Sequence, residues 1–345
     1  MQHLPNLMSL QEEFEVKVVC DLSPTLAATI AQDFHVPQHV SDYREALEAD
    51  VEAVLLCHAD PKTEAAVAAF EAGKHVFIEK PVCYSLQEID AILAVAQKSG
   101  RVGQAGYMRM YDPAFEYARR EVEGMDRIRF VQVNHLHPDN ALHLRHFRIK
   151  RFGDLPQDAG PKMQAAREKA VQEALGEVSA AAKRAFFILA NSTIHDLYGL
   201  RVLFGRPEEV ATAELWPEGS SISFVLAYPG GMRCVVSWVE LRDLWDFKGT
   251  LEVYGDDKRV LISYPTGLTN RMLSTLTLYG IDEEGTSFRQ EPAIDWENPF
   301  RRELRHFHEC IAQGADCRTS IEEARDDVAL IIDIIQTYIY RTQKA

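Results

Sequence analysis

The first hundred residues alternate short apolar runs with amphipathic helical segments. The runs are rich in β-branched residues and lie at 16–20, 51–57, 75–78 and 102–105. They are nearly continuous in apolar character, which is typical of parallel strands whose two faces are both covered by helices. This pattern predicts a doubly wound, Rossmann-like α/β sheet.

The helices between these runs have recognisable start and stop residues. The predicted helix starts are Ser23 with Pro24, Ser41, Asp60 with Pro61, and Ser85 with Glu88 three residues later as a capping box. Gly73 and Gly100 are predicted to end the two later helices. Residues 3–7 look like a further helical turn at the start of the sequence.

Polar residues follow the predicted strands, and in doubly wound sheets ligands bind at the carboxyl ends of the strands. The residues expected to meet a cofactor there are Asp21, Leu22, Cys57, His58, Glu79, Lys80, Pro81 and Gln104. Asp21 has two interpretations. It can accept hydrogen bonds from an adenosine ribose, which favours NAD over NADP, or it can simply begin the turn before Ser23.

The sequence has no G-x-G-x-x-G loop, although a dinucleotide-binding sheet normally opens with a strand and this loop. The strand before the loop is central in the usual order, so its absence would leave two neighbouring strands with unpaired backbone. The cost of unpaired buried backbone favours a gene product that starts about 30 residues earlier. A natural deletion that changes how the cofactor is held is the alternative.

Residues 72–81, AGKHVFIEKP, resemble the A-G-K-H-V-x-x-E-K-P signature of the Gfo/Idh/MocA oxidoreductases, the family of glucose-fructose oxidoreductase and inositol dehydrogenase. Segments 20–24, 106–113 and 307–332 also look like this family, so the resemblance covers nearly the whole chain except about 139–185. It implies hydride transfer between a nicotinamide cofactor and a secondary alcohol of a sugar, glycoside or cyclitol.

The resemblance implies that Lys80 lies beside the nicotinamide and the substrate, with a cis bond before Pro81. Without the resemblance, a lysine before proline would be a solvated loop residue. Tyr107 and Arg109 follow the last strand of the sheet, and we expect both to line the same substrate cleft.

Residues 191–197 resemble the D-x-x-x-H segment of the family, whose histidine, here His195, takes the proton of the substrate hydroxyl. Asn191 stands where inositol dehydrogenases have aspartate, and Tyr198 stands where a further aspartate is common. Positions i and i+4 share a helical face, so both Asn191 and His195 are expected to reach the site. An asparagine cannot stabilise an imidazolium by charge, so His195 is expected to be a weaker base here. A buried core histidine is the alternative for His195.

After residue 112 the pattern changes to strands joined by short turns. The predicted strands lie at 128–134, 210–216, 221–228, 232–240, 249–254 and 259–262, and two closing helices lie at 299–313 and 321–343. We therefore predict a dinucleotide-binding domain over 1–110 and an α+β domain over 111–345 with a mostly antiparallel sheet. The resemblance implies that this second domain binds substrate and forms a homodimer or homotetramer.

Residues 139–185 form an insertion whose Ala/Glu/Lys-rich part, 162–183, is predicted to be a helix. Four histidines, at 135, 137, 143 and 146, precede this predicted helix. They can bind a divalent metal, hydrogen-bond a carbohydrate, or form a solvated surface. The spacing fits no fixed ligand set, so no metal is expected, and His135 is predicted to contact substrate.

Composition narrows the range of functions. A net charge of −15 repels a phosphate backbone, so nucleic acid is not an expected partner. No apolar run approaches the roughly 20 residues of a membrane span, and the start does not resemble a signal peptide, so we expect a cytoplasmic protein. The six scattered cysteines are expected to be reduced thiols. A non-catalytic sugar or dinucleotide sensor, or a scaffold protein, on the same fold is the alternative that the missing glycine loop favours.

Overall fold

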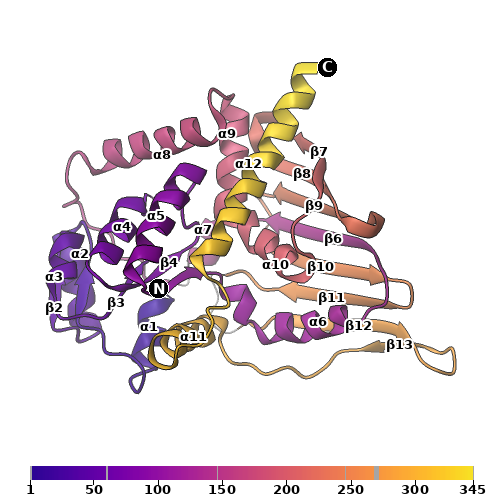
Figure 1. Cartoon of the computed structure of the whole chain (residues 1–345), viewed down its shortest axis with the longest axis horizontal. Helices are drawn as coiled ribbons and strands as arrows, with labels where there is room; N and C mark the ends of the chain where they lie inside the picture. The colour runs from indigo at the N-terminus through magenta and orange to yellow at the C-terminus, as the bar shows by residue number, and fades with distance from the viewer. Residues whose placement is uncertain (1, 60, 146, 245, 268–271, 345) are drawn as a thin grey trace. The chain divides into compact units, whose positions relative to one another are not determined.

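The computed structural model describes residues 2–59, 61–145, 147–244, 246–267 and 272–344 (Figure 1). They fold into two compact units, each assembled from separate stretches of chain. Unit 1 comprises Met1–Tyr107, Arg148–Gly176 and Phe300–Val328, and unit 2 comprises Met108–Phe147, Glu177–Pro299 and Ala329–Ala345. The domain boundary near residue 110 stays a prediction, and the sequence did not indicate that 148–176 and 300–328 fold with the first unit.

Unit 1 contains the predicted parallel strands with helices between them. The strands are β1 (Val18–Cys20), β2 (Gln38–Val40), β3 (Ala53–Leu56), β4 (His75–Glu79) and β5 (Gly103–Gly106). The helices are α1 (His3–Met8), α2 (Pro24–Asp33), α3 (Tyr43–Glu48), α4 (Thr63–Glu71), α5 (Leu86–Ser99), α8 (Ala159–Leu175) and α11 (Pro299–Gln313). All strand pairs of this unit are parallel, which confirms the Rossmann-like fold class.

The five strands of unit 1 form two sheets rather than one. β1 pairs with β2 in one sheet, and β3, β4 and β5 pair in that order in the other. In the usual order 3-2-1-4-5-6 these are the pair 3-2 and the trio 4-5-6, and the described residues supply no strand between them. One edge of β1 and one edge of β3 therefore carry backbone groups without a strand partner in the described chain.

Most of the predicted helix caps are confirmed. The Ser23 side chain accepts the backbone N–H of Leu26 in the first turn of α2, and Ser85 with Glu88 forms a reciprocal capping box on α5. Gly100 ends α5 in the left-handed conformation at φ 64°, which a residue with a side chain rarely adopts. Gly73, at φ 70°, directly follows the C-cap of α4.

The predicted cap at Ser41 is wrong by one residue. Asp42 caps α3 instead, because its Oδ1 accepts the backbone N–H of Arg44 at 2.9 Å. The unpredicted strand β2 continues to Val40, so the chain turns only after that residue. Asp60 lies outside the described residues, and α4 begins at Thr63.

Unit 2 is built on an eight-stranded open sheet in the order β13-β12-β11-β10-β6-β9-β8-β7. All neighbouring strands are antiparallel except β6 and β9. The strands are β6 (Ile128–His137), β7 (Glu209–Leu215), β8 (Ser221–Ala227), β9 (Arg233–Glu240), β10 (Lys248–Gly255), β11 (Lys258–Tyr264), β12 (Thr275–Ile281) and β13 (Ser287–Gln290). The mostly antiparallel sheet is confirmed, and β12 and β13 are additional strands at its edge.

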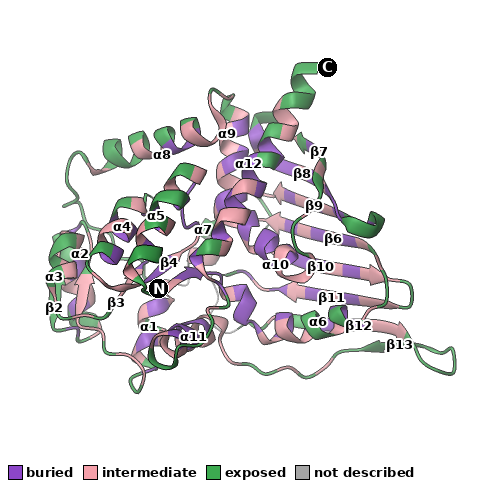
Figure 2. Ribbon diagram, in the orientation of Figure 1, coloured by how far each residue is buried: buried purple, intermediate pink, exposed green. Residues whose placement is uncertain are grey.

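The helices of unit 2 include α6 (Pro113–Glu123), α7 (Asn140–Leu144), α9 (Ala180–Ile188), the π-helical turn η2 (Leu189–Thr193) and α10 (Ile194–Phe204). Buried and less buried positions alternate along β9 and β6, as expected of a sheet with one well-covered face (Figure 2). The chain closes with α12 (Ile321–Lys344). None of the described helices has both the length and the apolar character that a membrane crossing requires.

The single helix predicted over 162–183 is wrong. The chain leaves α8 at Gly176, whose φ is 71° and ψ −151°, and Ser179 caps the separate helix α9. The alanine, glutamate and lysine residues on either side have high helix propensity, so the sequence predicts one continuous helix. A glycine at a positive φ nevertheless ends a helix, whatever its neighbours prefer.

Candidate functional site

In unit 1, a polar turn follows β4, where the sequence placed the cofactor. The Lys80–Pro81 bond is cis, as the resemblance implied. The backbone N–H of Lys80 donates to Glu79 Oε2 at 3.0 Å, and buried Lys62 donates from Nζ to the Pro81 carbonyl at 3.0 Å. The turn that presents Lys80 is thus fixed by hydrogen bonds on both sides of this residue.

Two glutamates lie in the interior of unit 1 beside this turn, and their pKa values are shifted in opposite directions. Burial opposes ionisation of Glu79, yet a 2.6 Å hydrogen bond to His3 Nε2 and the charges of His3 and Lys80 hold its pKa below the ordinary value. Glu303 on α11 is fully buried, and neither of its carboxyl oxygens has a hydrogen-bond partner among the described residues. Burial and the charge of Glu79 raise the pKa of Glu303 well above its usual range, which favours the neutral acid.

Asp21 follows the carboxyl end of β1. Its Oδ1 accepts the backbone N–H of Ser23 at 2.9 Å, which is the turn contact of the second interpretation. Its other oxygen makes no hydrogen bond within the described chain and keeps its lone pairs for a ligand. Asp21 can therefore hold the turn before Ser23 with one oxygen and accept a hydrogen bond from a ribose with the other.

The other predicted cofactor residues of unit 1 have different environments. Leu22 and Cys57 are exposed, and His58 is exposed with Nε2 at 3.2 Å from the Pro61 carbonyl. Gln104, in contrast, is fully buried, and its Nε2 donates to the backbone carbonyl of Glu303 at 3.1 Å. The Gln104 side chain therefore binds α11 inside unit 1, and its predicted contact with a cofactor stays a prediction.

In unit 2, His195 lies in the first turn of α10. Its Nδ1 is 2.9 Å from the Tyr198 hydroxyl, and this hydroxyl also accepts the backbone N–H of Arg109 at 3.3 Å. Tyr198 is fully buried, so the hydroxyl that meets the imidazole is held in place. A tyrosine thus orients the His195 ring at the position where the family commonly has a carboxylate.

Asn191 lies in the π-helical turn η2, immediately before α10. Its Nδ2 donates to the Phe187 carbonyl at 2.8 Å. A π-helical turn is wider than an α-helical one, so the i, i+4 spacing between Asn191 and His195 no longer guarantees a shared face. π-Helical turns are often found at functional sites, and the joint role of the two residues stays a prediction.

A buried charged network lies beside this helix. Asp196 accepts hydrogen bonds from Arg109 Nη1 at 2.5 Å and from His135 Nδ1 at 2.8 Å. Burial opposes its ionisation, but the charges of Arg109 and His135 hold the pKa of Asp196 below its ordinary value. The Arg109 guanidinium also lies 4.1 Å from the ring centroid of Tyr264. Arg109 and His135, both predicted substrate residues, are therefore buried partners of Asp196.

Aromatic side chains from β9 and from the residue before β10 contact the histidines of β6 beside this network. His135 Nε2 lies 3.2 Å from the Ser192 hydroxyl, which accepts the indole N–H of Trp238 at 2.8 Å. His137 stacks on Trp238 with centroids 5.5 Å apart and meets Phe247 edge-on. Burial lowers the pKa of His137, so its ring is neutral at neutral pH.

The sequence did not point to Asp196, Ser192, Trp238 or Phe247, although His135 and Trp238 are partners in the register of β6 and β9. A correct pairing of these two strands would have indicated Trp238, whereas Asp196, Ser192 and Phe247 require the tertiary structure. Tyr107 is almost fully buried. His143 belongs to α7, and His146 lies outside the described residues.

Known proteins resemble both the sequence and the fold. Residues 1–107 match the Gfo/Idh/MocA family model, described as an oxidoreductase family with an NAD-binding Rossmann fold. These residues belong to the Gfo/Idh/MocA family. The family assignment made from the decapeptide 72–81 is thereby confirmed.

Two curated relatives of this chain are an uncharacterized oxidoreductase, YrbE, of Bacillus subtilis strain 168 and the inositol 2-dehydrogenase of Salmonella paratyphi B. The first is 33% identical over 127 residues, covering 35% of this chain and 36% of the relative. The second is 31% identical over 117 residues, covering 33% of this chain and 35% of the relative. The matches thus span only about a third of the length of these relatives.

The fold likeness extends further than the sequence likeness. A solved structure of levoglucosan dehydrogenase in complex with NADH and levoglucosan aligns with a TM-score of 0.75 over 98% of this chain and 94% of that one. The two sequences are 17% identical, so this match establishes the fold of the chain and nothing about its ligands.

Proposed function

We propose that this Gfo/Idh/MocA chain is a nicotinamide-dependent oxidoreductase acting on a secondary alcohol of a sugar, glycoside or cyclitol. The observation that carries the proposal is the position of Lys80, in a turn fixed by hydrogen bonds at the end of β4, within a stretch that matches an NAD-binding oxidoreductase family. The names of the relatives support the substrate class, since they include an inositol dehydrogenase and a levoglucosan dehydrogenase.

The residues of unit 1 fit the two ends of a dinucleotide better than its middle. Asp21 offers one carboxylate oxygen to an adenosine ribose, which favours NAD over NADP. The turn at residues 79–81, together with Cys57 and His58, would lie at the nicotinamide end. The 345 residues contain no glycine loop for the pyrophosphate. NAD, when bound, accepts the hydride that leaves the alcohol carbon.

In this proposal the side chains of the protein handle the proton and the charge. His195 takes the hydroxyl proton, and the ammonium group of Lys80 stabilises the negative charge that develops on the substrate oxygen. Tyr198 orients the His195 ring through its hydrogen bond with Nδ1. Arg109 and His135 act as positioning residues through Asp196, while Tyr107 and Asn191 complete the predicted substrate set.

Calorimetric titration with NAD⁺ and NADP⁺, followed by a turnover assay over inositols, aldoses and anhydrosugars, tests the proposal. We expect NAD⁺ to bind and at least one polyol to reduce it. Lys80→Ala and His195→Ala should each abolish turnover without changing the circular dichroism spectrum. Lys98→Ala, at an exposed position on α5, is the matched control and should retain full activity.

A non-catalytic sensor is the second candidate, because the sequence contains no glycine loop. It predicts that a sugar or NAD⁺ binds without any turnover, and that Lys80→Ala leaves this binding unchanged. Binding without any turnover by the wild-type chain would replace the enzyme proposal. A homodimer or homotetramer formed through the open sheet of unit 2 is part of the proposal, and sedimentation of the purified chain would test it.

A further inference from the structure

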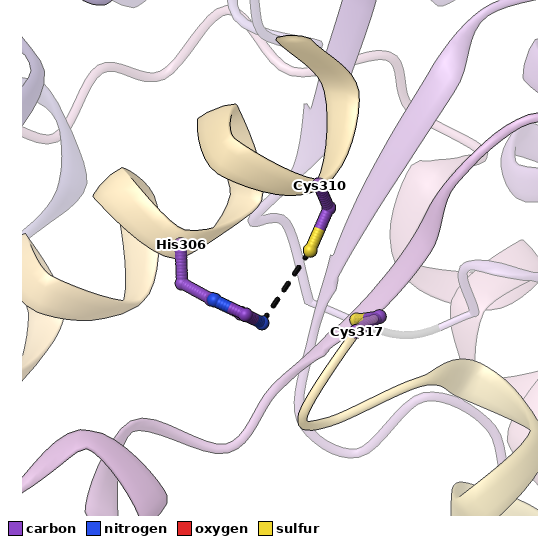
Figure 3. Close-up of side chains that lie close together, drawn as sticks. All are labelled: His306, Cys310 and Cys317. Carbon is purple, nitrogen blue, oxygen red and sulfur yellow. Dashed lines mark hydrogen bonds between the residues drawn. The ribbon is translucent and has the colours of Figure 1, made fainter. Parts of the chain in front are cut away.

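Three potential metal ligands lie together in unit 1, on α11 and in the connection that follows it. His306 and Cys310 are one turn apart on α11, and Cys317 follows in the connection to α12 (Figure 3). One ligand atom from each residue lies within 4.8 Å of the others, and His306 Nε2 is 3.4 Å from Cys310 Sγ. In a tetrahedral zinc site, the bond lengths give N···S edges of about 3.6 Å and S···S edges of about 3.8 Å. The three atoms therefore need to move by no more than about 1 Å to bind one ion.

The hydrogen bonds of His306 orient its ring as a ligand. Its Nδ1 lies 3.4 Å from Glu309 Oε2, and because a carboxylate only accepts, Nδ1 carries the proton. Its Nε2 accepts the backbone N–H of Arg318 at 3.1 Å, which agrees with this tautomer. Metal-binding histidines usually donate the other ring N–H to a carboxylate or carbonyl in this way. An ion would take the place of the Arg318 bond at Nε2.

The ligands are held by ordered structure. His306 and Cys310 are buried, and Cys317 is half-buried with Sγ at 3.6 Å from Gln104 Oε1. Two residues beyond Cys317, the Thr319 hydroxyl donates to the Ala105 carbonyl on β5 at 2.9 Å, and Ala105 donates back from its N–H to the Thr319 carbonyl at 2.8 Å. A bound ion would therefore join α11 to the connection that runs along β5.

We propose that His306, Cys310 and Cys317 bind one zinc ion, with a water molecule as the fourth ligand. Two thiolates and one neutral imidazole balance the charge of a divalent ion, which suits a buried position. Thiolate sulfur favours zinc over calcium or magnesium. The sequence had suggested histidine clustering only at 135–146, and the ligands proposed here come from a different part of the chain.

The metal content of the purified chain tests this site directly. After dialysis against a weak chelator we expect about one zinc ion per chain, as a single tetrahedral site requires. Cys310→Ser and Cys317→Ser should each lower the zinc content at least tenfold. Cys20→Ser, which changes an exposed cysteine, should keep the full zinc content. Glu309→Gln should weaken zinc binding about tenfold, because it changes the group that orients His306.

Cobalt substitution of the unaltered chain gives a readout that does not depend on the stability of the variants. Co²⁺ bound by two thiolates should produce a sulfur-to-metal charge-transfer absorption that zinc abolishes. No absorption and no zinc retention by the folded wild-type chain would overturn the proposal. So would thiol titration showing a Cys310–Cys317 disulfide in chain purified without reductant, together with no zinc binding after reduction.

Discussion

The Tyr198 hydroxyl lies 2.9 Å from Nδ1 of His195 and also accepts the backbone N–H of Arg109. A neutral hydroxyl is therefore a direct partner of the imidazole. A neutral partner fixes the orientation of the ring but adds no charge stabilisation to an imidazolium.

Tyr198→Phe should lower kcat by roughly 10- to 100-fold with little change in KM, because it removes the group that orients a general base. The fold should be retained, since phenylalanine nearly conserves the buried volume. Steady-state kinetics over a range of pH would measure the change. Tyr228→Phe is the matched control, because the buried Tyr228 hydroxyl has no hydrogen-bond partner in the described structure. Equal losses in both variants would contradict the positioning role.

Asp196→Asn should lower the free energy of unfolding by about 3–5 kcal/mol, because it leaves the buried guanidinium of Arg109 without its counter-charge. Urea denaturation would measure this loss. Glu123→Gln breaks an exposed pair with Arg119 and should change the free energy of unfolding by less than about 0.5 kcal/mol. A similar small effect at Asp196 would mean that the network contributes little to stability.

The stability that Asp196 contributes should depend on pH in a definite direction. Its pKa in the folded state is below the ordinary value, so the unfolded chain takes up a proton first as the pH falls. The contribution is therefore present above about pH 4, the unperturbed aspartate value, and is lost as pH falls through the folded pKa. The difference in unfolding free energy between wild type and Asp196→Asn should shrink in acid, and a constant difference would refute this assignment.

Glu303→Met should stabilise the chain by about 1–3 kcal/mol at neutral pH, because it removes a buried carboxyl group without hydrogen bonds. The folded pKa of Glu303 is raised, so the wild-type chain loses stability relative to the variant as pH rises above the ordinary glutamate value near 4.3. Thermal unfolding at several pH values would show this. Glu71→Met, at an exposed position, is the control and should change little. A destabilised Glu303→Met would point to a function for the acid.

Asp21→Ser should raise the ratio of NADP⁺ to NAD⁺ affinity by about tenfold or more, because it removes the carboxylate that favours a ribose 2′-hydroxyl and repels a 2′-phosphate. Calorimetric titration of both cofactors would measure the ratio. Asp50→Ser changes an exposed carboxylate and serves as the control. An unchanged ratio would leave Asp21 with only its turn contact to Ser23.

Local signals in the sequence predicted local structure well. The capping box of Ser85 and Glu88 lies within one helical turn, so its geometry follows from the spacing alone. Ser41 and Asp42 are both good caps, and the choice between them depends on where β2 ends, which was not predicted. The break at Gly176 depends on its positive φ, which composition does not reveal.

The candidate site of unit 2 was only partly predictable because its contacts are far apart in sequence. His135 and Asp196 are separated by 61 positions, and their contact requires β6 and α10 to be placed correctly. The same is true of Asp154, which accepts hydrogen bonds from Ser23 and Thr25 and so attaches the inserted segment to the start of α2. Motifs named Lys80 and His195 as candidates, whereas the residues that contact them depend on tertiary structure.

The division of unit 1 into two sheets also affects its dynamics. β1 and β2 each have three residues and pair only with one another among the described strands, and a two-stranded sheet of this size is marginally stable. Its amides should therefore exchange with solvent deuterium sooner than those of β3, β4 and β5. Because Asp21 directly follows β1, a ligand that binds this carboxylate must also rigidify the small sheet, and part of its binding free energy offsets the lost conformational entropy.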